Sequence, residues 1–159
     1  MEPVTQPLDL PGAYGRPDQT LAWPDVRSMV ERATHYWIST TRADGRPHVV
    51  PKDGIWLDDT LVFGGDTATV NHHNLSRDDR AVAHVGSGDD AVVVEGRASW
   101  LVPTDGQVRR LVAASSDKYG YAAPPEAYAA GVWALRPRRV FAWTRFPADA
   151  TRFVFDDRQ

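Results

Sequence analysis

The sequence predicts a mainly β fold, in which about six antiparallel strands form a closed or half-closed barrel with helices inserted between them. Runs of β-branched and aromatic residues recur along the chain, and helical periodicity is confined to a few separate segments. Short polar turns such as Asp44-Gly45 and Asp58-Asp59 join the runs. Because parallel strands need long crossover connections, turns this short exclude a doubly wound parallel sheet.

Composition limits both the size of the fold and the classes of partner. The chain has 159 residues, 42% of them hydrophobic, which suits one domain with a sizeable core. A net charge of −3 argues against nucleic acid as the main partner, because binding phosphates needs a basic face. No apolar run is long enough to span a membrane, and the start Met1-Glu2-Pro3 does not resemble a signal peptide. We therefore expect a cytoplasmic protein that binds neither nucleic acid nor membrane.

The first residues differ in character from the rest of the chain. Residues 1–19 contain four prolines, two glycines and no periodic apolar pattern, which predicts an irregular arm. Residues 20–159 are expected to form a single barrel domain. A helix is predicted from Trp23, because Pro24 suits its first position and Val26, Val30 and Ala33 fall on one face.

Three strands and a short helix follow. Residues 36–42 and 48–57 are predicted to pair as strands across the turn at Asp44-Gly45, and residues 60–64 form the third strand. A short helix is expected over residues 67–76, with Asp66 or Thr67 as its cap.

The second half repeats this alternation of strands and helix. Residues 81–85 and 91–101 read as strands joined by a polar turn. Thr104 and Gln107 form a capping box that opens a second clear helix, and a loop is expected over residues 119–125. Residues 132–144 return to strand with an interruption at Pro137, and residues 151–155 are expected to add a last edge strand.

The order of four segments resembles a known family. These segments read "ADGRPHVVP", "GIWLDDTLVFGG", "TVNHHNLSRDDRAVAHV" and "VVVEGRA". Together they are similar to the flavin-type split β-barrel proteins, which comprise the pyridoxamine 5′-phosphate oxidase-like group and its deazaflavin (coenzyme F-420) reductase branch. The segments "AASSDKYGY" and "FAWTRF" fit the F-420 branch better. The resemblance implies a six-stranded antiparallel split β-barrel of the FMN-binding type, which forms a homodimer with a cofactor cleft at each side of the interface.

The resemblance also implies which residues bind the cofactor. One strand would lie along the edge of the ring, two glycines would pass close to the cofactor, and the start of a helix would hold the phosphate. Lys118 would reach toward an anionic cofactor tail, unless it only complements the C-terminal end of its helix. In this chain the implied cofactor-binding residues are His48, Val49, Val50, Pro51, Lys52, Gly64, Gly65, Thr69, Val70, Asn71, Asn74 and Lys118.

Physical chemistry agrees with these roles and leaves alternatives open. Glycines let the backbone approach a flat ligand, and the free N–H groups of a helix start attract phosphate. The same helix start could instead be capped by its own side chains with no ligand. Family members usually carry a basic residue where this chain has Asn71. Lys52 either supplies that charge or pairs with Asp53 on the surface.

The other polar residues yield no catalytic group. His72 and His73 are adjacent and point about 100° apart on a helix, so they cannot easily chelate one metal ion, and no metal site is predicted. His48 is either structural or a ligand contact. Glu95 is expected to be a barrel or dimer-contact residue that pairs with an arginine, and not an acid–base group. No ordered serine, histidine and aspartate arrangement marks a hydrolase.

The favoured function is therefore an oxidoreductase that depends on FMN or on the deazaflavin coenzyme F-420 and transfers hydride to a small organic substrate. In such enzymes the cofactor carries the hydride, which explains why no acid–base pair stands out. Two alternatives share the barrel. One is a non-enzymatic protein that binds a flavin, deazaflavin or haem, and the other is a dimeric barrel without a cofactor.

Overall fold

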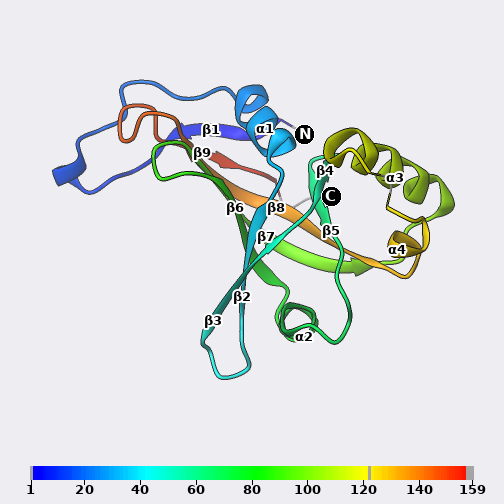
Figure 1. The fold of residues 1–159 in the computed structure, drawn as a ribbon. Helices are drawn as coiled ribbons and strands as arrows, with labels where there is room; N and C mark the ends of the chain where they lie inside the picture. The colour runs from blue at the N-terminus through cyan, green and yellow to red at the C-terminus, as the bar shows by residue number, and fades with distance from the viewer. Residues whose placement is uncertain (1, 122, 157–159) are drawn as a thin grey trace.

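The fold is a split antiparallel β-sheet with helices at its edges (Figure 1). The computed structural model describes residues 2–121 and 123–156. In these residues nine strands form one sheet, in which seven follow the order β1-β9-β8-β7-β6-β2-β3 and β5 pairs with both β4 and β8. The prediction of a mainly β, antiparallel split barrel is confirmed, although the strands are more numerous than six. The strands are β1 (Val4–Pro7), β2 (Tyr36–Thr41), β3 (Pro47–Lys52), β4 (Ile55–Leu57), β5 (Thr60–Phe63), β6 (Arg80–Gly86), β7 (Ala91–Leu101), β8 (Val132–Trp143) and β9 (Thr151–Val154).

Two of the additional strands have clear physical origins. The predicted strand over residues 48–57 divides at Asp53 and Gly54 into β3 and β4. A Cβ at Gly54 would lie 3.0 Å from Leu61 and 3.1 Å from the Tyr36 ring, so this tight crossing requires glycine. The segment 1–19 is not wholly irregular, because β1 pairs with β9. β9 is therefore not the edge strand that we expected. The division of the chain into an arm and one domain stays a prediction, and residues 157–159 lie outside the described residues.

The helices largely follow the sequence pattern. They are α1 (Trp23–Arg32), α2 (Val70–Arg77), α3 (Asp105–Tyr119) and α4 (Glu126–Ala129), with a short 3-10 turn η1 (Gly12–Tyr14). The capping box of Thr104 and Gln107 is present. α2 starts later than expected, because the Asp66 carboxylate accepts the Ala68 N–H and the Asp66 carbonyl accepts the Thr69 N–H, which forms a turn first. No helix in the described part of the chain is long and apolar enough to cross a membrane.

The long strand β8 runs through Pro137 without a break. Glu95 pairs with Arg139 and Gly96 pairs with Pro137, so a β-bulge between Glu95 and Gly96 leaves Arg138 as the extra residue. The missing N–H of proline falls where the ladder is already irregular. The expected interruption is therefore absorbed by the bulge.

The core lies between α1 and the inner face of the sheet. Trp23, Val26 and Val30 of α1 are buried, and the Trp23 ring contacts the rings of Trp56, Phe153 and Phe155. Inward side chains of the central strands complete the core, and they include Ile38, Ala83, Val94, Val140 and Phe153. The hairpin of β2 and β3 projects from the sheet, with α2 beside it (Figure 1).

Candidate functional site

Strand β3 forms one end of the sheet and offers an unpaired backbone edge. It pairs with β2 alone, and its side chains alternate between two faces. His48, Val50 and Lys52 are partly buried and share the face of the buried β2 residue Ile38, whereas Val49 and Pro51 are exposed on the opposite face. A free strand edge of this kind presents N–H and C=O groups that can bond to a ligand.

Lys52 lies against the glycine pair that follows β5. A Cβ at Gly65 would be only 3.0 Å from the Lys52 Nζ, so the ammonium group rests over the Gly65 backbone. Gly65 has a φ of +156°, a conformation that residues with a side chain rarely adopt. The structure therefore brings together two of the predicted segments, the end of β3 and the glycine pair.

The start of α2 has no side-chain cap within the part of the chain that the structure describes. Thr69 is the N-cap residue, but its side chain makes no capping bond, and its hydroxyl donates to the Asp66 carbonyl instead. The alternative in which Asp66 or Thr67 caps this helix is therefore wrong. Unpaired N–H groups at a helix start, with the positive end of the helix dipole, favour an anion.

Asn71 and Asn74 are both buried on α2 but differ in their partners. The Asn74 Nδ2 donates to the Thr40 hydroxyl at 2.9 Å, which ties the helix to β2. Asn71 is only 3% exposed, and its Nδ2 has no hydrogen-bond partner within the described residues. A buried amide without a partner is costly and needs an explanation, such as a ligand that accepts from it.

This contrast gives a first prediction. Replacing Asn71 with the similarly branched leucine is expected to raise the free energy of unfolding of the ligand-free protein by about 1 kcal/mol, because an unpaired buried polar group disappears. The same change is expected to weaken cofactor binding. Urea unfolding and cofactor titration measure the two effects. The matched control Asn74→Leu is expected to destabilise the protein, since it removes the partner of Thr40. Equal destabilisation by both changes would contradict the interpretation.

The histidines fall into separate environments. Burial, followed by the charge of Arg42, lowers the pKa of His48, whose Nδ1 lies 3.5 Å from the Arg42 guanidinium. His72 packs against Trp100 and Trp133, and its Nδ1 accepts the Trp133 indole N–H at 3.2 Å. No group of three or more histidine, cysteine or acidic side chains in the described residues is arranged to hold a metal ion.

Lys118 anchors the end of α3 to the chain crossing at Gly54. Its Nζ donates to the Tyr36 hydroxyl at 2.7 Å and to the Gly54 carbonyl at 3.1 Å. The Tyr119 hydroxyl donates to the same carbonyl at 2.9 Å. Burial lowers the pKa of Lys118 to about 8, although Asp53 and Glu31 act in the opposite direction. Its binding to a cofactor stays a prediction, and the structure gives its ammonium two protein acceptors.

A second prediction follows from this lowered pKa. Above pH 8 the folded protein releases the Lys118 proton, whereas the unfolded chain keeps it until about pH 10.5. Stability linked to Lys118 therefore rises as the pH increases through this window. Because the side chain is partly exposed, we expect a gain of only about 1 kcal/mol between pH 7.5 and 9.5. Urea unfolding should show the gain in the wild type and not in Lys118→Met, and identical pH dependence in both would disprove the linkage.

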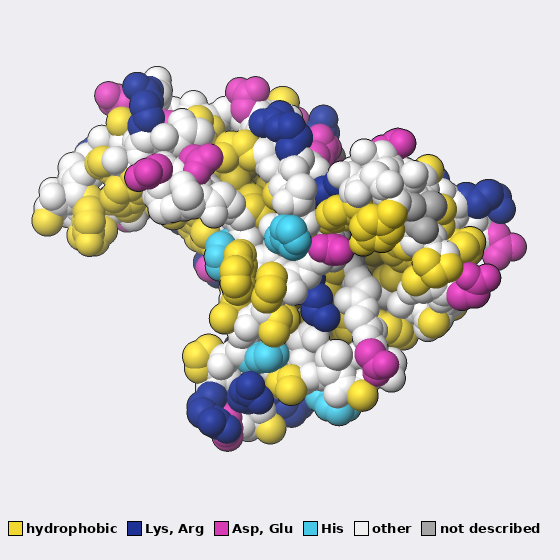
Figure 2. All heavy atoms as spheres, in the orientation of Figure 1, with side chains coloured by type: hydrophobic (Ala, Val, Ile, Leu, Met, Phe, Trp, Pro, Cys, Tyr) yellow, Lys and Arg dark blue, Asp and Glu magenta, His cyan; other side chains and the backbone are white. Residues whose placement is uncertain are grey.

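The opposite face of the sheet carries an uncovered surface. In register across the strands lie Pro51, Trp37, His84, Val93 and Phe141, and Trp37 is 44% exposed with its ring stacked on His84. Figure 2 shows exposed hydrophobic side chains gathered over β2 and β3. We call this surface the outer sheet face.

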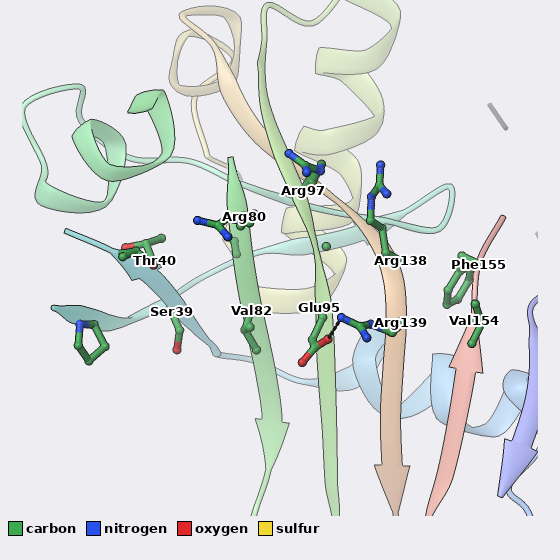
Figure 3. A pocket seen from close by; sticks show the side chains of 14 residues that line it. Ser39, Thr40, Arg80, Val82, Glu95, Arg97, Arg138, Arg139, Val154 and Phe155 are labelled. Carbon is green, nitrogen blue, oxygen red and sulfur yellow. Dashed lines mark ion pairs between the residues drawn. The ribbon is translucent and has the colours of Figure 1, made fainter. Parts of the chain in front are cut away.

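A depression of about 680 Å³ lies on this outer sheet face (Figure 3). None of the predicted cofactor-binding residues lines it. Three of its four arginines form ion pairs, because Arg139 contacts Glu95 at 3.1 Å, Arg80 contacts Asp78 at 2.7 Å and Arg97 contacts Asp79. The expected ion pair of Glu95 with an arginine is confirmed. The depression is therefore lined by several charged side chains, most of them in ion pairs.

Sequence reasoning missed the residues that hold the site in place. Thr40, Tyr36 and Tyr119 each bond to a site segment that is far away in the chain, for example Asn74 to Thr40 across 34 residues. No local pattern signals such contacts. The burial of Asn71, in contrast, could have been found, because Asn71, Asn74 and Leu75 lie on one face of a helix at the spacing i, i+3, i+4.

Comparison with known families places the chain. The family model described as pyridoxamine 5′-phosphate oxidase matches residues 22–144, a range that includes every residue of the candidate site. The chain belongs to this family. No curated protein matched the chain. The matched range includes the segments around β3, the glycine pair and α2.

Solved structures agree on the fold. A conserved hypothetical protein from Mycobacterium tuberculosis aligns with a TM-score of 0.67 at 19% identity, over 79% of this chain and 86% of that chain. An F420 reductase aligns with a TM-score of 0.57 at 23% identity, over 72% and 94% of the two chains. A heme binding protein from Mycobacterium smegmatis aligns with a TM-score of 0.61 at 19% identity, over 90% and 59%. At these identities the similarity shows the fold alone.

Proposed function

We propose that this protein is an oxidoreductase that uses FMN or the deazaflavin coenzyme F-420 to transfer hydride to a small organic substrate. Four features together support the proposal, and all of them lie within the range that the family model matches. They are the free edge of β3, the Lys52 ammonium over Gly65, the uncapped start of α2 and the unpartnered Asn71 amide.

The residues present fit a flat, anionic cofactor. The edge of β3 from His48 to Lys52 offers backbone donors and acceptors to a ring, and Gly64 and Gly65 leave room for it, since a Cβ at Gly64 would meet nothing within 4 Å. The start of α2, with Thr69, Val70 and Asn71, would bind the phosphate. When bound, the ring supplies the hydride chemistry. The chain orients the ring, and because His48 has a lowered pKa it stays neutral beside it at pH 7.

We further propose that the protein is a homodimer and that the partner copy covers the outer sheet face. This face exposes Trp37 and Val49 at 44% and 50%, and a second copy would bury them. Large exposed apolar patches rimmed by charged residues mark interaction surfaces. Glu95 and Arg139 at the centre provide both signs of charge, which suits a self-complementary contact. Sedimentation of the purified protein tests the proposal, and a monomer at micromolar concentration would contradict it.

A second candidate function is a non-enzymatic protein that binds a flavin, a deazaflavin or haem. The neutral Asn71 at the start of α2 favours it, because a charge-assisted contact to phosphate is replaced by an amide contact that is weaker by about 1–2 kcal/mol. The similarity to a heme binding protein supports a fold that can hold such a ring. A barrel without any cofactor is the third alternative.

The visible spectrum of the protein, purified without added cofactor, is the first test. Titration with FMN, with F-420 and with haem follows, with ring fluorescence or absorbance as the signal. Binding of FMN or F-420 together with reduction or oxidation of the bound ring by a substrate supports the oxidoreductase. Binding without turnover, or binding of haem alone, supports the second candidate. If none binds below about millimolar, both are wrong.

A further inference from the structure

Lys52 is a cation whose neighbouring acid is already engaged. Asp53 lies next to it in the sequence, but the Asp53 carboxylate accepts from the Tyr121 hydroxyl at 3.1 Å and lies 3.6 Å from His35. The structure gives Lys52 no hydrogen bond or ion pair within the described residues. The surface pairing of Lys52 with Asp53, which the sequence left open, is therefore wrong. Its ammonium group is therefore available to bind an anion.

The Lys52 ammonium lies beside the Gly65 backbone. A Cβ at residue 65 would lie 3.0 Å from the Nζ, so glycine leaves the space that the ammonium occupies. The chain continues from Gly65 to Asp66, whose carbonyl accepts the Thr69 N–H and so brings the start of α2 back toward the glycine pair. The Lys52 ammonium therefore lies beside the short loop that leads from Gly65 into the start of α2.

The other cations near the site are occupied. Lys118, the only other lysine, donates to Tyr36 and Gly54. Arg42 lies beside His48 at the far end of β3, four residues along the strand from Lys52. Asn71, at the first turn of α2, contributes an uncharged donor. Lys52 is thus the candidate for a full positive charge beside the glycine pair that leads into α2.

We infer that Lys52 supplies, from β3, the positive charge that holds the phosphate of the cofactor, in place of a basic residue on α2. The inference rests on the proposed function, because it assumes a phosphorylated ring in this cleft. The phosphate would lie between the Lys52 ammonium and the α2 N–H groups, with the Asn71 amide as an additional donor. Lys52 is then a residue that selects for phosphorylated over phosphate-free forms of the ring.

The test compares rings with and without the phosphate. Dissociation constants are measured by ring fluorescence for FMN and riboflavin, which differ only in the phosphate, and for F-420 and its phosphate-free deazaflavin, which lacks the whole phosphate-containing tail. In Lys52→Met the affinity for the phosphorylated form is expected to fall at least tenfold, with less than a twofold change for the phosphate-free form. Lys52→Arg is expected to retain most of the affinity. Arg109→Met, which removes an exposed cation of α3, serves as the matched control and is expected to change neither constant.

The outcomes separate this inference from the function on which it rests. Equal losses for both forms in Lys52→Met would place Lys52 at the ring and overturn the inference. Unchanged affinities would overturn it as well, and both results leave the oxidoreductase proposal standing. If the wild type binds the phosphate-free ring as tightly as the phosphorylated one, no charge holds the phosphate and the inference fails. Absence of all ring binding would overturn the proposed function and the inference together.

Discussion

Trp23→Ala is expected to lower the free energy of unfolding by about 3–5 kcal/mol, the usual cost of emptying a core site of this size. The side chain is 2% exposed, and its ring centroid lies 5.0–6.4 Å from those of Phe155, Phe153 and Trp56. Its indole N–H has no partner in the described residues, so alanine forfeits packing and no hydrogen bond. Such a loss is a large part of the stability of a domain of this length. Urea denaturation followed by circular dichroism measures it.

Trp37→Ala is the matched control, because it removes the same side chain from the outer sheet face. Trp37 is 44% exposed, and its only ring contact in the described residues is the stack on His84. We expect a loss below about 1.5 kcal/mol at concentrations where the chain is monomeric. A larger loss that grows with protein concentration would show instead that the partner copy buries this face. Equal losses for the two variants in the monomer would contradict the assignment of the core.

Local patterns in the sequence predicted the elements whose stability is local. The helix periodicity of α1 and the capping box of α3 depend on residues three or four positions apart, and both are present in the structure. The hairpin of β2 and β3 follows from the Asp-Gly turn at residues 44–45. For these elements the interactions that decide the structure lie within the segment itself.

Tertiary packing decided the elements that the sequence did not predict. β1 forms because β9 offers it a partner almost 150 residues away in the chain, as in the pairing of Val4 with Val154. The break at Gly54 depends on the closeness of Leu61 and Tyr36. The amino-acid pattern around these contacts does not predict them. The composition of residues 1–19, for example, is typical of an irregular segment.

The candidate site shows the same division. The family resemblance named the segments of the site, and the family match covers all of them. Individual roles could not be read from the residues alone, because they depend on neighbours in space. The pair His72 and His73 drew attention as possible ligands, yet His72 packs on Trp133, whereas Lys52 and Gly65, which are 13 positions apart, meet in the structure.

Gly96 lies at the β-bulge between β7 and β8, next to Glu95 on the outer sheet face. A Cβ at this position would lie 2.0 Å from the Arg136 carbonyl oxygen and 2.9 Å from its carbon, both of them backbone atoms of β8. Contacts below 3.0 Å cannot be relieved by rotating a side chain when the neighbour is backbone, so the two strands have to separate. The pairing of Glu95 with Arg139 lies directly beside this point and sets the centre of the outer sheet face.

Gly96→Ala is therefore expected to destabilise the protein by about 3 kcal/mol, at the upper end for overpacking, because the β7–β8 ladder has to open at the bulge. Urea unfolding measures the loss, and sedimentation shows whether dimer formation weakens with it. Gly88→Ala, in the turn before β7, is the matched control, since a Cβ there meets nothing within 4 Å. Its expected effect is within about 0.5 kcal/mol. Similar stabilities for the two variants would mean that β7 and β8 approach less closely at Gly96 than the structure places them.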